Sequence, residues 1–78
     1  MGVTEDLADN LARDTIAAME KLKDDNLISE VAKQLAATST TAEEAFMTSV
    51  RVRLAEKRAR EFLKKRVTDF AAGKPHDG

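Results

Sequence analysis

The sequence predicts an all-α fold: a small domain of two shorter helices and one long C-terminal helix, in a dimeric helical bundle. Apolar residues recur at helical spacing in three segments, whereas alternation typical of a strand does not extend beyond Val50-Arg51-Val52. Only three Gly and one Pro interrupt the 78 residues. A chain of this length has room for one core, so we expect a single domain over residues 1–72 and a flexible tail at 73–78.

The first helix is expected at about residues 4–23, with Thr4 as its N-cap. The residues of its apolar face are Leu7, Ala8, Leu11, Ala12, Thr15, Ala18, Met19 and Leu22. The residues expected on the opposite, solvent-facing side are Asp6, Asp9, Arg13 and Glu20. This pattern is that of an amphipathic core helix.

A second, shorter helix is expected at about residues 26–37, capped by Asp25 or Asn26. A polar turn at 38–41 follows it. The apolar residues of this helix are Leu27, Ile28, Val31, Ala32 and Leu35.

The third helix is expected at about residues 41–72, a stretch without Gly or Pro. Thr41 and Glu44 have the spacing of a capping box, and Thr40 and Glu43 offer the same box one residue earlier. At about 1.5 Å per residue this helix is roughly 45 Å long, more than the diameter of a globule of this mass. It must therefore protrude, bend or find a partner.

The end of the long helix is marked by two residues. Gly73 can adopt the left-handed conformation that closes a helix, and Pro75 cannot continue one.

The long helix carries two apolar stripes instead of one. Placed at about 100° per residue, its first part and its second part turn their apolar residues to sides that differ by roughly 150°. Either the helix kinks or ends near 48–54, or it is straight and its halves bury against different bodies. We favour a straight helix because Thr48 and Ser49 are only mild helix breakers. The first stripe consists of Phe46, Met47, Val50 and Leu54, and the second of Val52, Ala55, Ala59, Phe62, Leu63, Val67 and Phe70.

Charge is strongly divided along the chain. Up to Glu44 there are ten acidic and four basic residues, a net charge of −6, whereas residues 51–66 hold eight basic and two acidic ones, a net charge of +6. The whole chain is close to neutral, with a formal net charge of −1. Three interpretations follow: acidic short helices that pair with the basic helix, a nucleic-acid surface, or a basic amphipathic helix on an anionic membrane or in a partner's groove. The first is favoured.

One segment bears on the nucleic-acid interpretation. In residues 31–46, a helix with a small Ala32 is followed by a polar turn and a second helix with an apolar face, and the segment resembles a helix-turn-helix. That resemblance implies a second helix whose first residues read the major groove. Here those residues include Glu43 and Glu44, which would face phosphates, and Ala36 stands where a turn glycine is usual.

No catalytic or metal-binding pattern is present in the sequence. There is no Cys, no phosphate-binding Gly loop, and the single histidine is His76 in the expected tail. We therefore expect no enzyme activity and no cofactor. No apolar run is long enough for a membrane span and the N-terminus has no secretory pattern, so we expect a cytoplasmic protein.

The function that these patterns favour is a non-enzymatic protein-interaction or regulatory module that self-associates as a homodimer. The alternative is a small DNA-binding regulator that uses the segment 31–46 and the basic helix 51–66. The expected self-association residues are Ala55, Ala59, Phe62, Leu63, Val67 and Phe70. The nucleic-acid contacts of the alternative are Arg51, Arg53, Arg58, Lys64 and Lys65.

Overall fold

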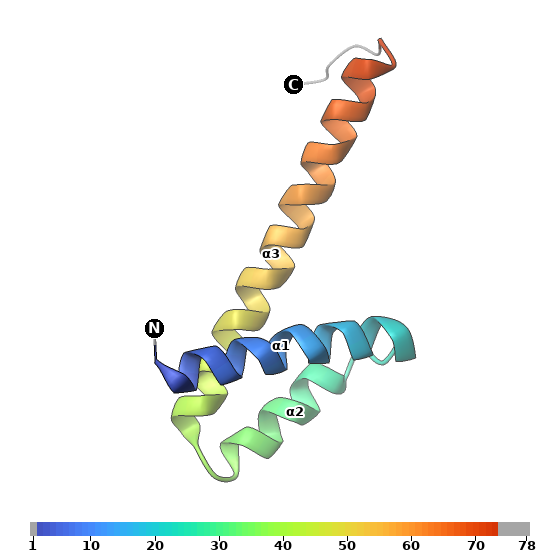
Figure 1. The fold of residues 1–78 in the computed structure, drawn as a ribbon. Helices are drawn as coiled ribbons and strands as arrows, with labels where there is room; N and C mark the ends of the chain where they lie inside the picture. The colour runs from blue at the N-terminus through green and yellow to red at the C-terminus, as the bar shows by residue number, and fades with distance from the viewer. Residues whose placement is uncertain (1, 74–78) are drawn as a thin grey trace.

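Three helices make up almost all of residues 2–73, the part of the chain that the computed structural model describes. They are α1, Val3–Leu22; α2, Leu27–Ala36; and α3, Thr40–Ala71. In Figure 1, α1 and α2 form a helical hairpin, and α3 begins beside both and runs far beyond them. The all-α fold with a long C-terminal helix is thus confirmed. Of the expected tail at 73–78, only Gly73 lies within the described residues.

The ends of α1 differ from the prediction. Gly2, not Thr4, is the N-cap, and the backbone N–H of Gly2 donates a hydrogen bond to Oε1 of Glu5 at 2.9 Å. Gly2 has the extended backbone that an N-cap requires, so the helix starts early enough to include Thr4. At the other end, Lys23 adopts a left-handed conformation with φ of 55° and turns the chain toward α2.

The start of α2 has no side-chain cap of its own. Asn26 occupies the N-cap position without a side-chain hydrogen bond, and its backbone N–H donates to Oδ1 of Asp24 at 3.0 Å. The prediction that Asp25 or Asn26 caps this helix is confirmed for the position, which is Asn26, but the side chain of Asn26 makes no capping hydrogen bond. Asp24 instead closes an Asx-turn that positions the chain ahead of the helix.

The start of α3 is capped by Ser39, not by Thr41 or Thr40. The Oγ of Ser39 accepts a hydrogen bond from the backbone N–H of Ala42 at 3.1 Å. Ser39 has the extended backbone of an N-cap, whereas Thr40 already belongs to the helix. At the other end, the prediction for Gly73 is confirmed: its φ is 74°.

The core is small and lies where the first half of α3 crosses α1 and α2. Phe46 is completely buried, and Val50, one turn further along α3, is also buried. They pack against Ala8, Ala12 and Ala32, whose small side chains let the three helices approach closely. The partly buried residues around this core are Leu11, Ile28, Val31, Leu35, Ala45, Met47 and Leu54.

The long helix neither ends nor bends sharply in the region 48–54, and it leaves the rest of the molecule there (Figure 1). The radius of gyration over Cα atoms is 16.4 Å, whereas a compact chain of this length has about 11.5 Å. The longest dimension is 53 Å. The structure therefore consists of a three-helix body and a protruding half of α3.

Candidate functional site

The protruding half of α3 carries an apolar stripe that no other part of the described chain covers. Phe62 is 62% exposed, Leu63 56%, Val67 60% and Phe70 85%. Val52, Ala55 and Ala59 continue the stripe toward the body and are also exposed. We call these seven residues the exposed stripe. They include every residue that the sequence predicted for self-association.

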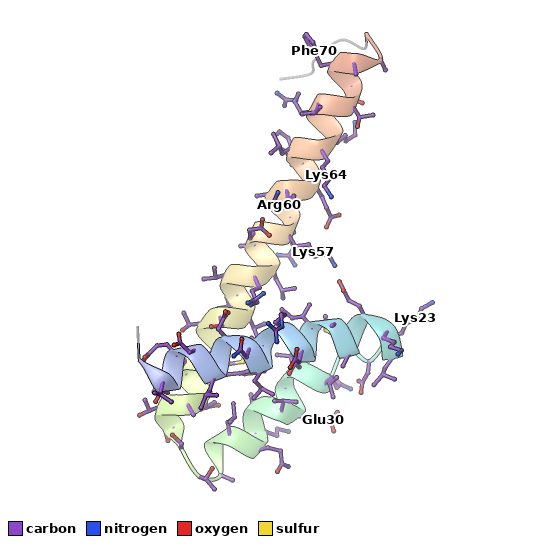
Figure 2. The ribbon with its side chains drawn as sticks, viewed as in Figure 1. Lys23, Glu30, Lys57, Arg60, Lys64 and Phe70 are labelled. Atoms are coloured by element: carbon purple, nitrogen blue, oxygen red, sulfur yellow. The ribbon has the colours of Figure 1, made fainter. Side chains whose placement is uncertain are left out.

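The basic residues of this half lie largely on the other side of the helix. In Figure 2, Lys57 and Lys64 point toward the side on which the far end of α1 lies, and Phe70 points away from them. At 100° per residue, Lys57 and Lys64 are about 140° from the middle of the exposed stripe. The protruding half is therefore amphipathic, with one side apolar and the other charged.

A bidentate ion pair marks the point where α3 leaves the body. Nε of Arg53 donates to Oδ1 of Asp9 at 2.8 Å, and a terminal guanidinium nitrogen donates to Oδ2 at 2.7 Å. The hydrogen bond from Arg53 holds the pKa of Asp9 below its ordinary value, although desolvation opposes the shift, and Asp9 in turn raises the pKa of Arg53. Arg53 therefore fastens α3 to α1 in this structure.

A second ion pair joins the same two helices. Nζ of Lys57 pairs with the carboxylate of Glu20, near the C-terminal end of α1. The prediction that Asp9 and Glu20 lie on the face opposite the apolar one is wrong, although Glu20 is exposed. Both lie about 100–120° from Ala8 around the helix, on its flank, and α3 crosses α1 on that flank.

Within residues 2–73, the other basic residues of α3 either contact a side chain of the same helix or form no ion pair. Arg60 pairs with Glu56, and Lys65 pairs with Asp69 at 2.7 Å. The Arg66 guanidinium lies over the Phe62 ring, 4.8 Å from its centroid. Three of the predicted nucleic-acid contacts form no ion pair with any residue from 2 to 73, namely Arg51, Arg58 and Lys64. Intramolecular pairing between body and basic helix thus involves only its first turns.

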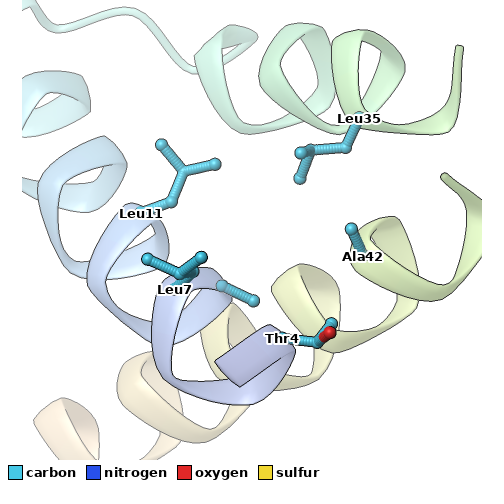
Figure 3. Close-up of a pocket in the computed structure, with 6 residues that line it drawn as sticks. Thr4, Leu7, Leu11, Leu35 and Ala42 are labelled. Atoms are coloured by element: carbon cyan, nitrogen blue, oxygen red, sulfur yellow. The ribbon is translucent and has the colours of Figure 1, made fainter. Parts of the chain in front are cut away.

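A shallow apolar hollow lies on the body, at the end of α3 opposite the exposed stripe (Figure 3). Its volume is about 240 Å³. Leu7 and Leu11 of α1 face Leu35 of α2 across it, and Thr4, Ala8 and Ala42 complete the lining. The helical pattern placed Leu7 on the core face, but Leu7 is 64% exposed because α1 and α2 diverge toward this end (Figure 1).

The segment with a helix-turn-helix pattern spans the junction of α2 and α3. Residues 37–39 connect the two helices. Thr40, Thr41 and Glu44 are exposed at the start of α3, whereas Glu43 is partly buried. An exposed first turn is what a groove-reading helix needs, but here it carries acidic side chains and no basic ones.

Sequence reasoning did not foresee the Asp9–Arg53 pair or the hollow. The only signal for the pair was the position of Asp9 and Glu20 on one flank of the first helix. Their partners, Arg53 and Lys57, lie 44 and 37 residues further along the chain. The hollow depends on the angles between helices, for which the sequence held no signal.

Within the described part of the chain, no group of His, Asp and Glu side chains is arranged to hold a metal ion. None of the helices in residues 2–73 has both the length and the hydropathy required to cross a bilayer. Comparison with known proteins gives no relative: no family model, no curated protein and no solved structure matches this chain. Any function must therefore be argued from the surfaces described above.

Proposed function

We propose that this chain is a non-enzymatic interaction module that self-associates through the exposed stripe. The observation that carries the proposal is the set of four large apolar side chains, Phe62, Leu63, Val67 and Phe70, each more than half exposed on one side of a helix. Two of the three phenylalanines of the chain are in this set. A continuous apolar surface of this kind is typical of an interaction site.

The stability of the protruding half also favours a partner. Beyond the Lys57–Glu20 pair, residues 58–71 extend away from the body and almost all of them are exposed, and an isolated helix of this length is only marginally stable in water. Its junction to the body supplies a helical nucleus, but burial of the stripe would supply the tertiary packing from which most helices gain their stability.

A second copy of the chain suits the charges beside the stripe. Both signs occur there: Arg51 and Arg58 on one flank together with Asp69, and Glu56 on the other. A flank with both signs can pair with a copy of itself, whereas an acidic protein or a nucleic acid would be favoured by a purely basic one.

The test is sedimentation equilibrium of three proteins at low and at moderate salt. The wild type is expected to be a dimer at both salt concentrations because the buried surface is mainly apolar. Leu63→Asp, which places a charge in the exposed stripe, is expected to be a monomer. Thr68→Asp adds the same charge on the opposite side of the same helix, where Thr68 is exposed, and is expected to remain a dimer.

Two results would overturn the proposal: a wild type that stays monomeric over the accessible concentration range, or a Leu63→Asp variant with unchanged mass. Leu63 is too exposed to support the body, so its replacement is expected to leave the three-helix fold intact. Circular dichroism and thermal unfolding of the variant would check this.

The second candidate is a DNA-binding regulator. The observation in its favour is that Arg51, Arg58 and Lys64 form no ion pair within residues 2–73. If these three contact phosphates, a rise from 50 to 200 mM salt would weaken duplex binding about 40-fold. Binding that depends little on salt, or no binding at low salt, would contradict it.

A further inference from the structure

The exposed stripe has its small and large residues in different parts of the helix. Its two small residues, Ala55 and Ala59, follow Val52 in the part nearer the body, and the far part consists of the larger Phe62, Leu63, Val67 and Phe70. The distance between two packed helices depends on the side chains between them and ranges over about 8–10 Å. The orientation of a second copy therefore decides whether this distance is uniform.

A parallel pair in register would place each residue of the stripe against the same residue of the second copy. Ala55 and Ala59 would face the same alanines of the second copy, which allows a close approach, but Phe70 would face a second Phe70 and force the helices apart. An antiparallel pair would place the two small residues, Ala55 and Ala59, against larger ones. The helices would then lie at a constant distance, which permits the close packing found in protein interiors.

We infer that two copies pair through the exposed stripe with their α3 helices antiparallel, an inference that rests on the proposed self-association. A register centred on residue 61 pairs six of the seven residues of the exposed stripe. Val52 then lies level with the partner's Phe70, Ala55 with the partner's Val67 and Ala59 with the partner's Leu63, whereas Phe62 lies level with the partner's Arg60. By symmetry each contact occurs twice, so six apolar layers are formed.

The charged residue within the stripe supports the same orientation. Arg66 lies about 30° from the middle of the stripe by the wheel geometry, and its guanidinium rests on Phe62. In a parallel pair Arg66 would face the partner's Arg66 at the centre of the interface, where like charges are costly. In the antiparallel register it faces the partner's Glu56. Arg51, which has no ion pair in residues 2–73, comes close to the partner's Asp69.

The antiparallel orientation also separates the two bodies. The acidic part of the chain, with a net charge of −6 up to Glu44, lies in α1, α2 and the start of α3. A parallel pair would bring two such bodies side by side. In the antiparallel pair the paired halves of α3 act as a spacer that holds one body, with its apolar hollow, at each end.

The orientation can be tested by disulfide cross-linking because the chain contains no Cys. Val52→Cys and Phe70→Cys are prepared separately and as an equimolar mixture, which is unfolded, refolded and then oxidised. Val52 and Phe70 lie at the same angle on the helical wheel, so antiparallel pairing brings position 52 close to the partner's position 70, within the Cα separation of about 4.4–6.8 Å that a disulfide requires. The two copies of position 52 are then about 18 residues apart along the helix, or about 27 Å.

The mixture is therefore expected to form at least about ten times as much disulfide-linked dimer as either variant alone. A mixture of Val52→Cys with Thr68→Cys, whose thiol lies on the opposite side of α3, is the matched control and is expected to give little. Sedimentation equilibrium of the reduced variants checks that each is still a dimer.

The outcomes separate this inference from the proposed function. Val52→Cys that cross-links efficiently with itself would overturn the antiparallel orientation and leave self-association intact. A dimeric mixture without the mixed disulfide would overturn the register proposed here. A wild type that is monomeric in sedimentation would overturn self-association, and the antiparallel pair with it.

Discussion

The first half of α3 completely buries Phe46, whereas the second half leaves Phe62 more than half exposed, although both belong to one uninterrupted helix. The apolar side of the first half faces α1 and α2, and that of the second half points roughly the opposite way. Only the first half is thus stabilised by the fold of its own chain. The second half continues a helix that begins in the body, but its apolar residues do not pack against the body. They are available for a partner.

The largest expected difference between the halves is in folding stability. Phe46→Ala is expected to lower the free energy of unfolding by about 3–5 kcal/mol because it leaves a cavity at the centre of the core. Phe62→Ala is expected to change it by less than about 0.5 kcal/mol because its side chain is largely solvated. Both are compared by urea unfolding in a Leu63→Asp background, so that dimerisation does not contribute. Equal effects would show that the second half is buried against the body.

Hydrogen exchange gives the next largest contrast. In Leu63→Asp, amides in residues 58–69 are expected to exchange by local opening, at least about tenfold faster than those of residues 45–54, which exchange by unfolding of the core. In the wild-type dimer this difference is expected to shrink, because the stripe is covered. Equal protection of the two halves in the monomeric variant would contradict the conclusion that only the first half is stabilised by the fold of its own chain.

A smaller effect is expected at the junction of the two halves. Arg53 lowers the pKa of Asp9 in the folded state, so the stabilisation by this pair is present above the unfolded pKa and is lost as pH falls through the folded one. Asp9→Asn is therefore expected to be less stable than the wild type at neutral pH. The difference should vanish well below the ordinary pKa of an aspartate, about 3.9. Urea unfolding across pH 2–7 measures it, and a pH-independent difference would argue against the ion pair.

The smallest effect is expected at a buried hydroxyl of the body. Oγ1 of Thr15 donates to the carbonyl oxygen of Leu11 at 2.7 Å, one turn earlier in α1. Thr15→Val keeps the shape and removes the hydroxyl together with its need for a partner, so a change below about 1 kcal/mol is expected. A larger loss would show that the hydroxyl has a role in packing α1 against its neighbours.

Local patterns were enough to predict most of the backbone. Helical spacing, the absence of Gly and Pro from the long segment, and Gly73 after it gave helices whose ends lie within one residue of the observed ones. The identity of the caps was predicted less well. Ser39, Thr40 and Thr41 can all accept a backbone hydrogen bond, and which one does so depends on where the chain leaves α2.

By itself the sequence determined that the chain is helical, that its charge is divided, and that the long helix has two apolar stripes on different sides, because these are properties of neighbouring residues. Only the tertiary structure decided which stripe belongs to the core. It placed Asp9 against Arg53 and Glu20 against Lys57 and opened the hollow beside Leu7. Those results depend on the angles at which helices cross, which are set by packing between residues far apart in the chain.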